Sequence, residues 1–338
     1  MSRRIGRSRE FLAVLYPLTF QPIFKERVWG GRSLERLYGK PLPPDVPIGE
    51  SWEIADRPEG VSVIANGPLA GKTLRWLMEE HRSELLGRQA PPNGPFPLLV
   101  KILDARDRLS VQVHPPRGQA AALGGEPKTE MWYITDAAPE AVLYVGLKAG
   151  VSREEFEQRI RDGTVAESLH RINVKTGAAI FLPSGRLHAI GAGNVLFEVQ
   201  QNSDTTYRVF DWNRAGLDGK PRALHVAESL ASIDFQDFEP GLIASKYSRN
   251  RTFKVRYLVD DPLFRVDACL VKRGQRFHLR SDSVQVLGLV GGRLEIRHEA
   301  SGQAVRLEAG QFCLLPACLD RASVQAERQS EFLLVQPG

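Results

Sequence analysis

The chain is divided into many short apolar runs, and this pattern limits the folds that it can adopt. The runs are rich in valine, isoleucine, leucine and phenylalanine, are punctuated by glycine and proline, and lie at residues 61–64, 98–103, 141–145, 178–182, 195–200, 284–290 and 312–315. Many short strands with turn signals between them are typical of an antiparallel barrel or sandwich. We therefore expect a mainly β protein.

Two stretches are expected to be helices inserted into this β frame. Residues 74–86 carry a mixed apolar face. Residues 152–169 begin with Ser152 three positions before Glu155, which is the spacing of a helix-capping box.

Two segments far apart in the chain resemble each other. KTGAAIFLPSGRLH at 175–188 and LEAGQFCLLPACLD at 307–320 both contain a glycine, an apolar strand and then a proline. An internal repeat of this kind predicts two jelly rolls. The first copy ends in His188 and the second contains no histidine, so we expect only the first to hold a metal.

The N-terminus superficially resembles a secretory leader, because three arginines precede a short apolar run at residues 11–16. Glu10 abuts that run, and Pro17 ends it without a small-residue cleavage site. The expected division of the chain is a disordered extension at 1–15, a metal-binding catalytic domain with helical insertions at 16–245, and a second jelly roll without metal ligands at 246–338.

Length, charge and cysteine content narrow the class of protein. The 338 residues suit one large domain or two smaller ones, and no apolar segment is long enough to span a bilayer. A net charge of +5 without a dense basic run favours an anionic small molecule over nucleic acid. The odd, widely spaced cysteines Cys269, Cys313 and Cys318 suit no disulfide framework and predict a reducing cytoplasm. The oligomeric state is left open.

The segment LSVQVHP at 109–115 has the character of a strand with one polar face. Residues two apart in a strand project to the same side, so Ser110, Gln112 and His114 are expected on one face and the two valines on the other. The same spacing places Lys128 and Glu130, in KTEMWY, on one face.

Together with Gln112, His114 and Glu130, His188 completes a set of two imidazoles, one carboxylate and one amide on three separate strands or turns. Two histidines and a carboxylate with an open position suit zinc, and also ferrous iron. Because Gln112 is neutral, Zn²⁺ would be offset by a single carboxylate and would stay a strong Lewis acid.

Two cationic residues are candidates for chemistry beside this cluster. Lys128 is placed for proton transfer, although taken alone it is as well explained as a solvated surface lysine. Arg208 shares its strand parity with Asp204 and Thr206 and can clamp a phosphate or stabilise an oxyanion. Taken alone, Arg208 is better explained as a surface Arg–Asp ion pair. The tryptophans Trp29, Trp52 and Trp132 are expected to pack in the core or at the pocket rim.

The motifs LSVQVHP, KTEMWY, LPSGRLHAIGAG and QNSDTTYR, in this order, resemble those of type I phosphomannose isomerases, zinc enzymes of the cupin superfamily. IGESWEI at 48–54 and PFPLLVKILDA at 95–105 match as well, and the resemblance covers about residues 17–235. It looks closest to the short bacterial form. The implied fold is two cupin-like jelly-roll barrels with helical insertions.

The resemblance also implies roles for individual residues. The family's zinc ligands, with one Zn²⁺ per chain, fall on Gln112, His114, Glu130 and His188. The other implied site residues are the active-site arginine Arg208, the pocket lysines Lys101 and Lys128, and Ser110, near the phosphate. The sequence departs from the family where QVHP is commonly followed by acidic residues, because Pro116 and Arg117 stand there.

The implied reaction is the reversible conversion of mannose 6-phosphate into fructose 6-phosphate through a zinc-assisted cis-enediol, with Lys128 as the first candidate for the base. The sequence leaves two alternatives open. An iron-dependent cupin oxygenase would consume oxygen, and a non-catalytic barrel that binds a sugar phosphate would bind without turnover.

Overall fold

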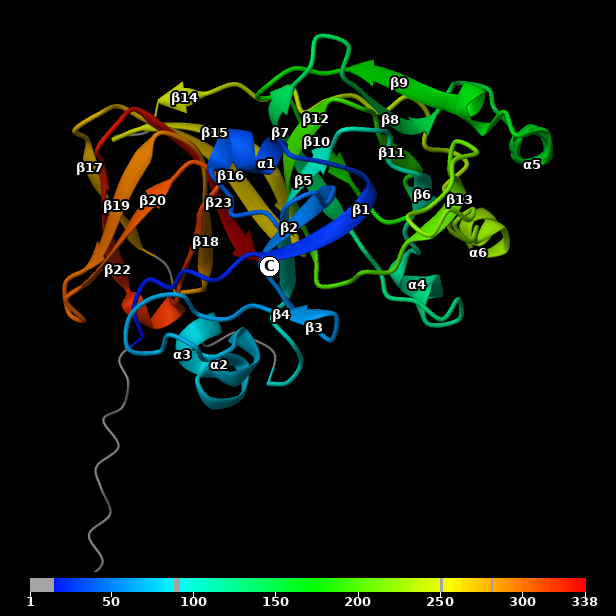
Figure 1. Cartoon of the computed structure of the whole chain (residues 1–338). Helices are drawn as coiled ribbons and strands as arrows, with labels where there is room; N and C mark the ends of the chain where they lie inside the picture. Colours follow the sequence, from blue (N-terminus) through cyan, green and yellow to red (C-terminus); the bar gives the residue numbers. More distant parts are fainter. Residues whose placement is uncertain (1–14, 88–91, 250–251, 281) are drawn as a thin grey trace, which may run out of the picture.

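The computed structural model describes residues 15–87, 92–249, 252–280 and 282–338. The expected extension lies, apart from its last residue, outside the described residues, and that last residue, Leu15, is buried. The described chain is mainly β, as expected, with short helices between the strands (Figure 1). None of the helices in these ranges has the length and apolarity that crossing a membrane requires.

A first pair of antiparallel sheets contains most of the strands before residue 211. The six-stranded sheet has the order β1 (Ile23–Gly31), β2 (Ile48–Ile54), β5 (Leu98–Ala105), β12 (Asn194–Gln201), β7 (Glu130–Ala137) and β10 (Ala179–Leu182). The five-stranded sheet has the order β13 (Tyr207–Phe210), β6 (Val111–Val113), β11 (His188–Ile190), β8 (Val142–Leu147) and β9 (Leu169–Asn173). An apolar cluster that includes Leu103, Leu143 and Leu196 packs between the two sheets.

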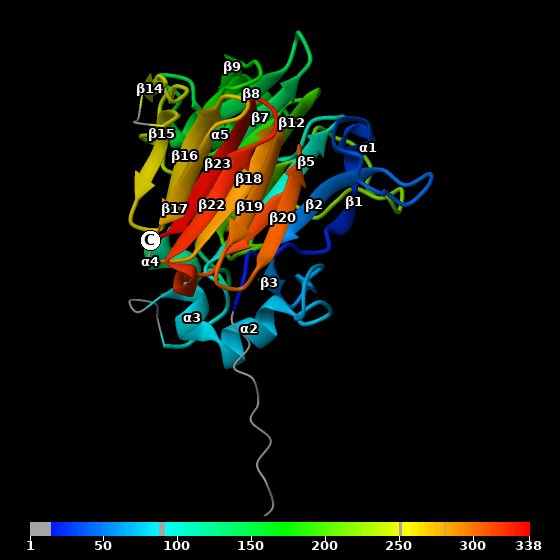
Figure 2. The ribbon, with the colours of Figure 1, turned by 90° about the vertical axis from the view of Figure 1, so that its left-hand side faces the viewer.

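A second pair of sheets follows. Its six-stranded sheet has the order β14 (Ser248–Arg249), β15 (Lys254–Asp261), β16 (Phe264–Val271), β23 (Ser330–Pro337), β18 (Gln285–Gly291) and β21 (Phe312–Leu315). Its four-stranded sheet has the order β17 (Arg276–Arg280), β22 (Arg321–Ala326), β19 (Arg293–His298) and β20 (Gln303–Glu308), and this sheet is in front in Figure 2. A small sheet joins β3 (Asp56–Arg57) to β4 (Gly60–Val61).

The two six-stranded sheets pack face to face, so the molecule is built in layers (Figures 1 and 2). One apolar cluster includes Val100 and Phe197 of the first sheet with Val266 and Phe312 of the other. The rings of Phe197 and Phe312 lie 4.9 Å apart, centre to centre. The six-stranded sheet of the first pair, called here the inner sheet, is therefore buried on one face by the second pair. Its other face is available for a site.

The strand order repeats between the two pairs, as the sequence repeat suggests. The order β5, β12, β7, β10 recurs as β16, β23, β18, β21, and the order β6, β11, β8, β9 recurs as β17, β22, β19, β20. In this register Leu182 lies opposite Glu130, just as Leu315 lies opposite Gln285. Gln285 thus takes the place of Glu130 in the second copy. The division of domains at residue 245 stays a prediction.

The expected helices are shorter than the sequence suggested. Residues 74–86 form two helices, α2 (Leu74–Glu80) and α3 (Arg82–Leu86), because the chain leaves helical geometry at His81, where φ is −133°. Residues 152–169 form α5 (Arg153–Asp162), in which Ser152 Oγ accepts a hydrogen bond from the Glu155 N–H, and a following 3-10 turn. The remaining helices are α1 (Ser33–Tyr38), α4 (Arg117–Ala120) and α6 (Val226–Ser232).

The expected strands at 98–103, 141–145, 178–182, 195–200, 284–290 and 312–315 are confirmed within a few residues as β5, β8, β10, β12, β18 and β21. The expected strand at 61–64 is wrong as a continuous element. Only Gly60–Val61 forms a strand there, and Val63 and Ile64 make isolated bridges to Thr73 and Phe20.

Candidate active site

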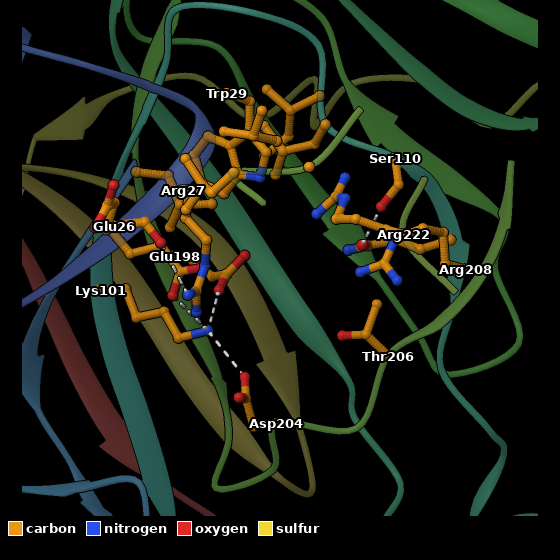
Figure 3. A pocket seen from close by; sticks show the side chains of 18 of the residues that line it. Glu26, Arg27, Trp29, Lys101, Ser110, Glu198, Asp204, Thr206, Arg208 and Arg222 are labelled. Atoms are coloured by element: carbon orange, nitrogen blue, oxygen red, sulfur yellow. Dashed lines mark hydrogen bonds and ion pairs between the residues drawn. The ribbon is translucent and has the colours of Figure 1, made fainter. Parts of the chain in front are cut away.

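A charged cavity lies in the first pair of sheets. Its volume is about 540 Å³, within the range of ordinary small-molecule sites. Its walls come from β1, β2, β5, β7 and β12 on one side and from β6, β13 and the loop after β13 on the other (Figure 3). It can therefore enclose a ligand of sugar-phosphate size.

Three of the four predicted metal ligands meet beside this cavity. His114 follows β6, Glu130 begins β7 and His188 begins β11, and one ligand atom from each lies within 4.8 Å of the others. His114 Nε2 is 3.5 Å from one Glu130 carboxylate oxygen, and His188 Nε2 is 3.4 Å from the other. The fourth, Gln112, lines the cavity with its Nε2 atom 3.3 Å from His188 Nε2. If the amide is turned over, its oxygen is offered instead.

The donor atoms of this cluster fit a metal ion. Each histidine has its Nδ1 atom 2.8 Å from a backbone carbonyl, Thr205 for His114 and Arg186 for His188, so that Nδ1–H donates and Nε2 keeps its lone pair. His114 Nε2 and both carboxylate oxygens of Glu130 are buried without a hydrogen-bond partner. Unpaired buried polar atoms are costly, and a cation between them would satisfy all three.

The charge states of the three side chains suit the same use. Burial lowers the pKa of His114 to about 3 and also lowers the pKa of His188, so both imidazoles are neutral. Burial acts to raise the pKa of Glu130, but the neighbouring Lys128 outweighs it and holds that pKa below its usual range. Two neutral imidazoles and one carboxylate are the protonation states that metal binding requires.

The predicted alternation of the LSVQVHP segment is present in the structure. Ser110 and Gln112 line the cavity, whereas Val111 and Val113 pack in an apolar cluster. The strand itself is short, Val111–Val113, so His114 lies just beyond its end.

The two predicted pocket lysines both line the cavity but differ in their surroundings. Lys128 Nζ is 3.5 Å from Glu130 Oε2, and the side chain is 4% exposed. Lys101 Nζ lies 3.2 Å from Glu198 and 3.7 Å from Glu50. Burial acts to lower the pKa of Lys101, but these carboxylates outweigh it and raise the pKa above the ordinary value. Lys101 is therefore a fixed ammonium.

Arg208 lies on β13 directly opposite Gln112 and lines the cavity. Its Nη1 donates to the Ala223 carbonyl at 2.9 Å, and its buried Nε has no hydrogen-bond partner. The surface Arg–Asp pair considered above is not formed, because Asp204 faces Lys101 at 3.9 Å. Burial, with Arg222 nearby, lowers the pKa of Arg208 from its usual value.

Glu198 is a pocket residue that the sequence reading missed, because the run at 195–200 was read only as an apolar strand. Its side chain accepts a hydrogen bond from Trp132 Nε1 at 2.8 Å and pairs with Lys101. Burial, with Glu130 close by, raises the pKa of Glu198. The sequence did offer one signal for this residue, because Glu198 is a single acidic residue between apolar neighbours in that run. Trp132 is buried, as expected. Its ring is nearly perpendicular to that of His188, and the two ring centres lie 5.4 Å apart.

Arg222 is the second missed residue, and it makes one end of the cavity cationic. It lines the cavity from the loop after β13 and pairs with Asp211 through two hydrogen bonds of 2.6 and 2.7 Å. Figure 3 shows Arg222 and Arg208 beside Ser110 on one side, with Lys101, Glu198 and Asp204 on the other. The cavity is therefore polarised along its length.

Comparisons with known proteins agree with this site. A family model described as the catalytic domain of type I phosphomannose isomerase matches residues 18–147. A probable mannose-6-phosphate isomerase of Bacillus subtilis is 44% identical over 220 residues, covering 64% of this chain and 68% of the relative. The mannose-6-phosphate isomerase of Streptococcus mutans is 37% identical, covering 89% of this chain and 92% of the relative. The crystal structure of the mannose 6-phosphate isomerase from Bacillus subtilis superposes with a TM-score of 0.84 at 32% identity, covering 94% of this chain and 99% of that one.

Proposed function

The chain belongs to the type I phosphomannose isomerase family, and from this premise we propose how its pocket interconverts mannose 6-phosphate and fructose 6-phosphate. It is an aldose-ketose isomerase. Membership of this family favours the predicted isomerase activity over the two alternatives, an iron-dependent oxygenase and a non-catalytic barrel. The observation that carries the proposed mechanism is the buried His114–Glu130–His188 cluster beside a cavity of polarised charge. The reaction moves one proton from C2 to C1 of the opened sugar and one from O2 to O1, through a cis-enediol.

We propose that His114, Glu130, His188 and Gln112 hold one Zn²⁺ per chain. Two imidazole nitrogens, a carboxylate and a neutral amide suit zinc, and the unpaired donor atoms of the cluster support a resident cation. When bound, the ion supplies Lewis-acid stabilisation of negative charge on the substrate oxygens. The side chains around the cavity supply the rest of the chemistry.

Lys128 is our candidate for the base that moves the proton. Its Nζ atom is 3.5 Å from Glu130 Oε2. A substrate whose oxygens lie at the cluster would therefore have its reacting carbons beside this nitrogen. Only the neutral amine of a lysine can accept a proton, so the proposed step requires that form of Lys128. Lys101 cannot serve, because its carboxylate neighbours keep it protonated. The proposed role of Lys101 is instead to bind hydroxyl oxygens of the substrate.

The phosphate is proposed to bind at the cationic end of the cavity. Guanidinium groups match the geometry of phosphate oxygens and donate two parallel hydrogen bonds. Arg208 has an unused Nε donor there, Arg222 lines the same wall, and the Ser110 hydroxyl lies beside them. The sugar then extends toward Lys128 and the cluster, and Arg208, which lies opposite Gln112, is proposed to stabilise the enediolate as well.

The Arg222→Ala variant tests this orientation. We expect KM for mannose 6-phosphate to rise about 10- to 100-fold with kcat changed only a few-fold, because the loss is one charge-assisted contact to a part of the substrate that does not react. Steady-state kinetics measure both constants. Arg214→Ala is the matched control, since Arg214 also pairs with Asp211 but does not line the cavity. An unchanged KM in Arg222→Ala would contradict the proposed phosphate position.

The cytoplasm stays the proposed location. Its support is that Cys269, Cys313 and Cys318 are free cysteines in the structure, which is consistent with a reducing compartment.

A further inference from the structure

Three separate chain segments deliver the proposed metal ligands, and one buried threonine joins two of them. Thr129 stands between Lys128 and Glu130, but it does not line the cavity as Lys128 does. Its hydroxyl oxygen accepts a hydrogen bond from the Ser184 N–H at 3.2 Å and lies 3.1 Å from the Ser184 hydroxyl. Ser184 belongs to the turn between β10 and β11 that leads into His188. The segments of Glu130 and His188 are thus linked directly.

The same turn is attached to the segment of His114. The Gly185 N–H donates to the His114 carbonyl at 2.8 Å, and Gly185 has a φ of +91°, which favours glycine. Arg186 pairs with Asp237 through two contacts of 2.8 Å, and its carbonyl lies 2.8 Å from His188 Nδ1. The turn at 183–187 is therefore the place where all three segments meet.

Thr129 is itself held firmly at the position just before β7. Its backbone N–H donates to the Gln201 side chain at 2.9 Å, and its carbonyl accepts from the Gln201 N–H at 3.1 Å. The side chain is buried, with the residue 4% exposed. A fixed hydroxyl of this kind can hold the turn in one position rather than follow it.

Without a cation, the cluster does not hold its own donors together. The carboxylate of Glu130 is 3.5 Å from His114 Nε2 and 3.4 Å from His188 Nε2, and no hydrogen bond to His114 Nε2 or to either carboxylate oxygen holds them there. Contacts outside the cluster must therefore keep these donors at binding distance. Hydrogen bonds outside the cluster do this without occupying any donor atom.

We propose that the two contacts between Thr129 and Ser184, called here the Thr129–Ser184 clasp, position Glu130 and His188 for metal binding. Thr129 is a positioning residue and touches neither metal nor substrate. Preorganised donors lose less freedom on binding, so the clasp raises metal affinity. This inference rests on the proposed metal site.

The test compares the Zn²⁺ dissociation constants of full-length variants, stripped of metal and titrated against a competing chromophoric chelator. Thr129→Val keeps the shape of the side chain and loses the hydroxyl, and we expect about 10- to 100-fold weaker zinc binding. Thr129→Ser restores the hydroxyl and should bind within about 3-fold of the wild type. The visible spectrum of the Co²⁺-loaded proteins reports the coordination geometry independently of activity.

Thr135→Val is the matched control, at a threonine within β7 itself. Thr135 makes side-chain hydrogen bonds to Tyr38 and Val195 but none to the turn at 183–187, so this variant should lose thermal stability and keep its zinc affinity. Zinc binding by Thr129→Val equal to that of the wild type would overturn the clasp alone. Equal weakening in Thr129→Val and Thr135→Val would overturn it as well. A wild-type chain that binds no zinc would overturn both the metal site and the clasp.

Discussion

Glu130→Gln is expected to remove the metal and lower kcat/KM by about 10³-fold or more, equivalent to a loss of about 4 kcal/mol of transition-state stabilisation. Glu130 is fully buried and supplies the single carboxylate of the cluster. Glutamine keeps its size and removes its charge, so the remaining donors face a divalent cation without any anionic partner. Metal content per chain and steady-state kinetics measure the two losses.

The repeat provides a matched control for this substitution. Gln285 occupies the position of Glu130 in the second pair of sheets and is also buried. Gln285→Ala should leave both zinc content and turnover unchanged. A Glu130→Gln protein that retains one zinc per chain and near-normal turnover would contradict the assignment of Glu130.

Lys128→Ala is expected to lower kcat by about 10²- to 10⁴-fold while zinc stays bound. The reason is that its nitrogen is the base in our mechanism, whereas the metal donors are all supplied by other residues. Exchange of the sugar C2 proton with deuterated solvent, followed by NMR, should fall in parallel because it requires the same proton transfer. Metal content of the variant separates this effect from loss of the metal.

Lys72→Ala is the control for removal of a lysine, since Lys72 packs over Trp76 outside the cavity. Its turnover should equal that of the wild type. Near-normal turnover in Lys128→Ala would remove Lys128 as the base and direct attention to Glu198, a buried carboxyl group that also lines the cavity.

The parts of the site that follow local periodicity could be predicted from the sequence. Alternation alone places Ser110 and Gln112 on the cavity side of β6, and the same parity brings Lys128 beside Glu130. The helix at 74–86 shows the limit of this reasoning, because nothing in its apolar pattern indicates the break at His81.

The parts that depend on long-range packing could not be predicted in this way. Arg222 reaches the cavity because Asp211 holds its guanidinium, and that pair spans a loop whose path the residue pattern does not fix. Glu198 is buried in the inner sheet, where Lys101 and Trp132 pair with it from neighbouring strands. Such contacts appear only when the strand order is known.

The two copies of the repeat show that strand order alone does not make a site. In the second pair of sheets the apolar side chains of Phe277, Leu287, Ile296 and Phe332 fill the space between the sheets. The first pair also has an apolar cluster between its sheets, but charged side chains line a cavity beside it. The same arrangement of strands therefore supports a reaction site in one copy and a packed core in the other.

The central claim is tested most directly by the conversion of mannose 6-phosphate into fructose 6-phosphate by the purified chain, before chelation, after chelation and after zinc is restored. Our account predicts activity that is lost with the metal and regained with zinc. Activity that survives complete removal of metal, or a zinc-loaded chain without activity, would contradict it.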